Sequence, residues 1–305
     1  MIRQSAAPEP NKYLIETPVK EGQTNREWLQ AVGARDGVIL LGGCSVAHFR
    51  LRVAQSHLRR DLTPSCWSFA GLLAGGETII SVPLDLTVDA SEMVLLNGVQ
   101  TCHIRDYDDP ERLPNIAVIN FPGDFGKVLQ SADILSKQRS IIDLPALVLH
   151  WLGHLWSTGQ VGNPLLAGYG IPSAVFAETV YGMADVELTP GLSSSASSPE
   201  AIWQSAKWWH NFYDTIAAGR GGTLEAADAG GEEDASVPKG FFLLRQPAAT
   251  AVGPKDQVVG QQVVRDDADA NADAADEPRA AKKRGGTKAG KRSRKGKRGG
   301  GKSAR

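Results

Sequence analysis

The feature that most limits how this 305-residue chain can fold is a change of composition after about residue 214. Residues 222–278 hold 12 acidic and 4 basic residues among many alanines and glycines, and residues 281–305 are almost wholly Lys, Arg, Gly, Ser and Ala. Neither stretch has enough apolar side chains to offset the conformational entropy that is lost on folding. We therefore expect a disordered C-terminal third and a fold confined to what precedes it.

Four parts follow from this composition. We expect a flexible N-terminus over 1–12, one domain over 13–214, an acidic linker rich in Ala and Gly over 215–278, and a basic tail over 279–305. One short apolar segment, 238–245 (PKGFFLLR), interrupts the linker. Two interpretations of it stay open, a strand docked on the domain or a separate binding motif.

Localisation signals are few. No apolar run approaches the roughly 20 residues that a membrane-spanning helix needs, and the N-terminus lacks the apolar core of a signal peptide. Cys44, Cys66 and Cys102 are odd in number and follow no metal-binding spacing, which is typical of free thiols in a reducing compartment. We expect a cytoplasmic protein.

Hydrophobic patterns predict the elements of the domain. Short apolar runs between turn residues predict strands, at 38–41, 67–73, 78–82, 98–104 and 116–121. Gly75 and Gly76 predict a hairpin between the second and third of these strands. Helical spacing predicts five helices, one capped by Ser45 and four later ones around 128–135, from Pro145, from 172 to 183 and after 198–200. This segregation of strands and helices indicates an α+β domain with an antiparallel sheet and packed helices.

Two residues at predicted helix starts are candidate nucleophiles. Cys44 ends a Gly-Gly-Cys turn between a strand and a helix, where the helix dipole favours a thiolate. Ser173 follows Gly170 and Pro172 at a helix start, where backbone N–H groups could stabilise an oxyanion. Each also has a structural interpretation, a small buried residue for Cys44 and a helix N-cap for Ser173.

A histidine pair offers the spacing of two zinc ligands, since His150 and His154 stand one helical turn apart. Trp151 occupies the position where a metalloprotease helix has its glutamate base, and no third ligand is evident. We therefore expect neither a metal nor a cofactor, and we interpret the pair as part of an aromatic-rich helix. The arginines of the helix after Ser45 are expected mostly on its solvent-facing side.

The order of these elements resembles a known enzyme family. The segments 37–41 (GVILL), 66–73 (CWSFAGLL) and 170–178 (GIPSAVFAE), with an arginine-bearing helix after the first, are similar to the circularly permuted papain-like amidases. This group includes relatives of the bacterial NlpC-type cell-wall hydrolases and of the lecithin:retinol acyltransferases. The resemblance covers roughly residues 36–213. It implies a permuted papain-like domain in which a strand supplies a catalytic His and a late helix supplies a catalytic Cys.

This chain departs from the family at its catalytic positions. Phe69 stands where the resemblance places the His, Ser173 stands where it places the Cys, and Ser81 falls near the residue that orients the imidazole. A phenyl ring cannot accept a proton, and a serine without a base is a weak nucleophile at neutral pH. The leading hypothesis is therefore a catalytically inactive domain that keeps its cleft as a binding module, for a small molecule, a peptide or an acyl group.

An active enzyme is the alternative hypothesis. It would be a hydrolase or acyltransferase on an amide or ester, with Ser173 or Cys44 as the nucleophile. It requires that another histidine enter the site, and the candidates are His48, His57 and His103.

The basic tail supports a hypothesis of its own. From Arg279 onward it holds 13 of the 33 Lys and Arg and no acid, which leaves 20 against all 34 Asp and Glu in the rest of the chain. Because it has no aromatic residue, it suits contact with a phosphate backbone but not stacking on bases. The tail could bind nucleic acid or another polyanion, as in a structural protein associated with nucleic acid, or it could fold back on the acidic part of the chain. The residues expected to bind polyanions are Lys282, Lys283, Arg284, Lys291, Arg292, Arg294, Lys295, Lys297 and Arg298.

Overall fold

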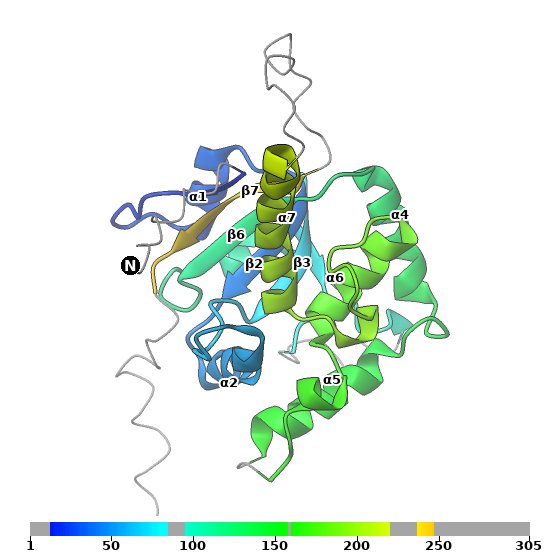
Figure 1. Ribbon diagram of the computed structural model, residues 1–305. Helices are drawn as coiled ribbons and strands as arrows, with labels where there is room; N and C mark the ends of the chain where they lie inside the picture. Colours follow the sequence, from blue (N-terminus) through cyan, green and yellow to red (C-terminus); the bar gives the residue numbers. More distant parts are fainter. Residues whose placement is uncertain (1–12, 85–94, 158–159, 220–236, 247–305) are drawn as a thin grey trace, which may run out of the picture. The chain divides into compact units, whose positions relative to one another are not determined.

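The computed structural model describes residues 13–84, 95–157, 160–219 and 237–246 (Figure 1). Its seven strands are β1 (Leu14–Glu16), β2 (Gly37–Gly42), β3 (Phe69–Ala74), β4 (Thr78–Ser81), β5 (Gln100–His103), β6 (Asn115–Asn120) and β7 (Lys239–Leu244). The six α-helices in these ranges are α1 (Asn25–Val32), α2 (Val46–Ala54), α4 (Phe125–Lys137), α5 (Leu144–Trp156), α6 (Pro172–Met183) and α7 (Pro199–Gly219), and the 3₁₀ helix η3 (Pro164–Ala167) follows α5. The expected α+β class is confirmed.

The strands form one open sheet in the order β1-β7-β6-β2-β3-β4-β5. Five neighbouring pairs are antiparallel, and only the edge pair of β1 and β7 is parallel. β3 and β4 form the expected hairpin, and its turn residues Gly75 and Gly76 both have positive φ angles, which glycine adopts without steric cost. The sheet is therefore mostly antiparallel, as the sequence predicted.

Helices cover both faces of this sheet. Along the central strand β2, Val38 and Leu40 belong to one cluster with buried side chains of α4, α6 and α7, which lie over the same face (Figure 1). Ile39 and Leu41 belong to the opposite cluster, which Trp28 of α1 helps to close. Because side chains alternate along a strand, the continuous apolar run of β2 is buried on both sides.

α6 is buried along most of its length. Every residue from Pro172 to Tyr181 is buried, and the helix packs on β3 and α4. Its bounds are those that the sequence predicted. Within the described residues, no helix combines the length and the apolar character that crossing a bilayer would require.

The segment 238–245 is a docked strand, one of the two interpretations that the sequence left open. β7 lies between β1 and β6, and Leu243 is fully buried there. Just after it, Arg245 donates hydrogen bonds to the side chain of Asn25 at 2.6 Å and to the carbonyl of Pro114 at 3.2 Å. The sheet thus includes residues from beyond the expected domain of 13–214. Residues 215–219 of the expected linker belong to α7, whereas 220–236, 247–305 and the N-terminal residues 1–12 lie outside the described ranges.

Truncation should reveal that β7 is part of the fold. A chain ending before Val237 leaves β1 without its pairing strand and removes Leu243 from the core, so we expect the free energy of unfolding to fall by at least about 3 kcal/mol. Urea unfolding measures this loss. The control ends after Gln246 and should match the full chain within about 0.5 kcal/mol. Equal stability of the two truncated chains would contradict the structural role of β7.

Candidate functional site

Ser173 lies in the first turn of α6, and its hydroxyl is hydrogen-bonded to the sheet. Its Oγ accepts a hydrogen bond from the backbone N–H of Ala70 at 3.2 Å, and only 2% of the residue is exposed. Ala70 lies in β3, two residues before Leu72, and the pair of Leu72 with Ile80 is the last one between β3 and β4 on this side. The Ala70 carbonyl is bonded in a similar way, since Ser81 Oγ donates to it at 2.6 Å. Ser173 and Ser81 therefore complete the backbone hydrogen bonds of one residue at the end of a ladder.

This environment lacks the partner that a serine nucleophile needs. In the described part of the chain, the hydrogen bond of Ser173 Oγ is the one to Ala70, and no imidazole or carboxylate bonds to it. The N-cap interpretation does not hold either, because the N-cap position of α6 is Ile171. The hydroxyl acts as an internal acceptor for the sheet.

Phe69 lies on the other face of the sheet from Ser173. Its ring packs on Tyr107 with centroids 5.4 Å apart, in the cluster that contains Trp28. The neighbouring Ala70 belongs to the opposite cluster, together with Ala174 of α6. Strand alternation therefore separates the two positions to which the resemblance assigns the base and the nucleophile.

The turn between β2 and α2 brings His48 and Ser68 together. Ser45 caps α2 as predicted, and Nδ1 of His48 lies 2.8 Å from Oγ of Ser68. That Oγ also accepts the N–H of Gly43 at 3.0 Å. A Cβ atom at Gly43 would stand 2.5 Å from the imidazole, so this pairing needs glycine there. The sequence pointed to His48 but gave no sign of its partner.

The other two histidine candidates have partners elsewhere. His57 Nδ1 lies 3.1 Å from the carbonyl oxygen of Ala54, and His103 Nε2 lies 3.7 Å from the carboxylate of Glu77. Neither is hydrogen-bonded to Ser173 in the described residues.

Cys44 lies half-buried in the turn that precedes α2, the helix that carries His48. Its thiol donates to Oε1 of Gln246 at 2.9 Å, so residues at the end of β7 reach this corner. Arg52 is also here and is only 1% exposed, which corrects the expectation of a solvent-facing side chain. Its length lets Nε reach the carbonyl of Ser65 at 2.6 Å. Burial lowers the pKa of Arg52, while the nearby thiols of Cys66 and Cys44 act to raise it.

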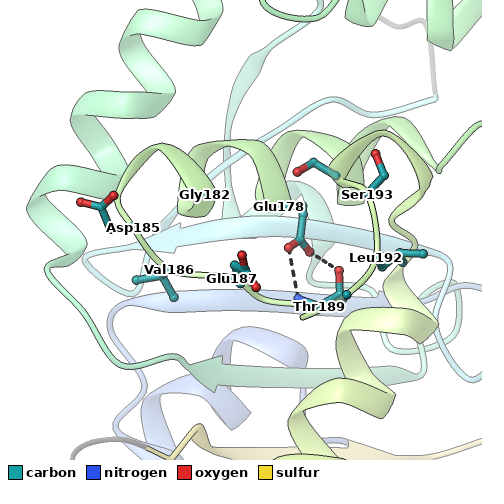
Figure 2. A pocket seen from close by; sticks show the side chains of 10 residues that line it. Glu178, Gly182, Asp185, Val186, Glu187, Thr189, Leu192 and Ser193 are labelled. Carbon is teal, nitrogen blue, oxygen red and sulfur yellow. Dashed lines mark hydrogen bonds between the residues drawn. The ribbon is translucent and has the colours of Figure 1, made fainter.

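A hollow of about 600 Å³ lies beside α6 (Figure 2). Side chains of the helix and of the loop after it line this hollow, namely Glu178, Gly182, Asp185, Val186, Glu187, Thr189, Gly191, Leu192, Ser193 and Ser194. The site residues predicted from the sequence include none of these. The available signal was Glu178, the one charged residue of this helix.

Glu178 holds the loop against the helix, as Figure 2 shows for Thr189. Its Oε1 accepts the N–H groups of Leu188 and Thr189, each at 3.1 Å. Its Oε2 accepts the hydroxyls of Thr189 at 2.8 Å and Ser197 at 3.3 Å. Burial raises the pKa of Glu178, and these four donors only partly oppose that effect.

His150 and His154 have separate surroundings. The ring of His150 packs on Tyr169 with centroids 4.5 Å apart, and His154 Nδ1 lies 3.3 Å from the carbonyl of Val161. No group of three His, Cys, Asp or Glu side chains within the described ranges is arranged to hold a metal ion. The nine predicted polyanion-binding residues, from Lys282 to Arg298, lie outside those ranges.

Comparisons with protein-family models, with curated proteins and with solved structures found no match. The resemblance to the permuted papain-like amidases therefore rests on short motifs and on the order of the elements. The function is therefore inferred from the geometry around Ser173, Cys44 and Glu178.

The raised pKa of Glu178 predicts a pH-dependent stability. The folded state holds this proton more tightly than the unfolded state, so stability falls as pH rises from the ordinary value near 4.5 through the raised value. Glu178→Gln removes the titration, and we expect the stability advantage of the wild type over this variant to shrink over that window. Urea unfolding at a series of pH values measures it. Parallel curves for the two proteins would show that Glu178 does not titrate differently on folding.

Proposed function

We propose that this chain is a catalytically inactive relative of the permuted papain-like amidases, and that it acts as a binding module whose basic tail contacts polyanions. The observation that carries the proposal is the burial and hydrogen bonding of the Ser173 hydroxyl. Its hydroxyl is buried and bonded to the Ala70 N–H, and no base bonds to it in the described parts of the chain. Acyl transfer needs an activated nucleophile that substrate can reach, and this serine meets neither condition.

The position of α6 supports the papain-like assignment. The helix starts after Gly170, where a Cβ atom would lie 2.3 Å from the carbonyl oxygen of Ser197. Its first turn meets β3 through the bond between Ser173 and Ala70, within the segment 66–73. The resemblance implies this kind of contact, in which a late helix meets the strand that would carry the catalytic histidine.

The hollow beside α6 supports a binding role. Two exposed carboxylates, Asp185 and Glu187, line it together with the hydroxyls of Ser193 and Ser194. Carboxylates and hydroxyls in one hollow suit a ligand that carries an amine or a guanidinium group. Of the three ligand classes considered, this lining favours a peptide over an acyl group.

A second function has one specific observation in its favour. Cys44 is half-buried just before α2, and Nη1 of Arg52 donates to the carbonyl of Gly43, the residue before it, at 3.3 Å. A cation and a helix N-terminus both favour a thiolate. If the chain is an enzyme, Cys44 is the better candidate nucleophile, because within the described residues no imidazole or carboxylate bonds to Ser173.

Chemical labelling separates the two functions. A fluorophosphonate should leave Ser173 unmodified in the full-length protein, as read by mass spectrometry, with an active serine hydrolase as the positive control. Ser173→Ala should lower the free energy of unfolding by about 1–3 kcal/mol, because the Ala70 N–H loses its acceptor. Stoichiometric labelling of Ser173 would contradict the proposal. Ester hydrolysis that disappears in Cys44→Ala would establish the alternative.

The tail should bind duplex DNA without sequence preference. We expect affinity to fall with salt, with a log–log slope on the order of −0.9 for each phosphate neutralised. Deleting 279–305 should abolish binding and leave the thermal transition unchanged, whereas a chain with the tail residues in scrambled order should bind like the wild type. Fluorescence anisotropy of labelled DNA measures the affinity of each variant. Full binding by the deleted chain would place the polyanion contact elsewhere.

A further inference from the structure

The side of α5 that faces away from the core carries no charged side chain. The helix sequence, LPALVLHWLGHLW, contains no Asp, Glu, Lys or Arg. One side of it is buried, with Val148, Trp151 and Leu155 in the core. The other side is exposed and consists of Ala146, Leu149, His150, Gly153 and Trp156. A surface helix normally carries polar or charged residues on such a side, so this composition is unusual for contact with water alone.

Neighbouring residues extend this exposed apolar surface. Leu149 is 64% exposed and Trp156 is 71% exposed. The 3₁₀ helix η3 contacts α5 and adds Leu166, also 71% exposed. Tyr169 joins the surface because its ring packs on His150. We refer to Leu149, Trp156, Leu166 and Tyr169 as the α5 face.

A cation lies at one end of the α5 face. Arg50 of α2 donates hydrogen bonds to the carbonyls of Leu155 and Ser157, the residues on either side of Trp156. Exposed aromatic and aliphatic side chains next to a cation are typical of segments that lie in the headgroup region of a membrane.

The charge distribution favours an anionic lipid surface as the occupant. The residues before Arg279 carry 20 basic against 34 acidic side chains, so most of that part would be repelled by anionic headgroups. The α5 face has no acid and can approach them. The tail adds 13 cations without an acid, and each cation near an anionic surface strengthens adsorption.

We propose that the α5 face inserts into the headgroup region of an anionic membrane while the basic tail supplies the electrostatic attraction. This inference rests on the polyanion-binding role proposed for the tail, and it identifies that polyanion as a lipid surface. Reversible membrane binding commonly needs two weak signals of this kind.

Vesicle flotation of the full-length protein tests the proposal. We expect binding to vesicles of phosphatidylcholine and phosphatidylglycerol, and little binding to phosphatidylcholine alone. The double variant Leu149→Ser and Trp156→Ser should bind about 100-fold more weakly, because two large apolar side chains no longer enter the lipid. Val19→Ser is a control at an exposed apolar residue outside the α5 face, since Val19 is 58% exposed between β1 and α1, and it should bind like the wild type. Both sites are exposed, so thermal transitions should stay unchanged.

Other outcomes separate this proposal from the proposed function. If the double variant binds vesicles like the wild type, the α5 face has no role, although the tail can still bind polyanions. If deletion of 279–305 leaves both DNA and vesicle binding intact, the proposed function of the tail fails as well. A protein that binds DNA but no vesicles would make nucleic acid the polyanion. A wild-type dimer that the double variant converts to a monomer, without vesicle binding, would assign the face to a second copy.

Discussion

The burial of α6 governs much of the structure around it. Because residues 172–181 have no solvent-facing side, Ser173 and Glu178 must find hydrogen-bond partners inside the protein. An unsatisfied buried polar group costs about 1–3 kcal/mol, and a buried charge costs more. Ser173 takes the N–H of Ala70, and Glu178 takes four donors from the loop that follows the helix. The burial of α6 thus determines the hydrogen bonds at the end of β3 and those that hold residues 185–197.

The same constraint gives the hydroxyl of Ser173 a structural role. A hydroxyl that completes a β-ladder cannot also face a substrate, and Phe69 lies on the opposite face of the sheet. The contact between β3 and the first turn of α6 is made by Ala70 and Ser173, and this hydrogen bond stabilises the fold. Features suited to binding lie away from Ser173, in the carboxylate-lined hollow and on the uncharged side of α5.

Much of the fold was predictable because local patterns agreed with the tertiary structure. The apolar run of β2, the Gly75–Gly76 turn, the capped start of α2 and the start of α6 at Pro172 each have a local physical cause. β1 and α1 were not predicted. β1 has only three residues, but α1 has a capping box between Thr24 and Glu27, a signal that sequence analysis could have used. The candidate site was predicted less well, since a single sequence does not show which side chains face each other.

By itself, the sequence determined the α+β class, most of the element positions and the separation of a basic tail from an acidic remainder, because periodicity and composition are local properties. Only the tertiary structure decided which partners the polar residues find. It placed β7 between β1 and β6, buried Arg52, and paired His48 with Ser68. These outcomes depend on contacts between residues far apart in the chain. The free energy of burying each group is set by what packs around it, and no local pattern contains that information.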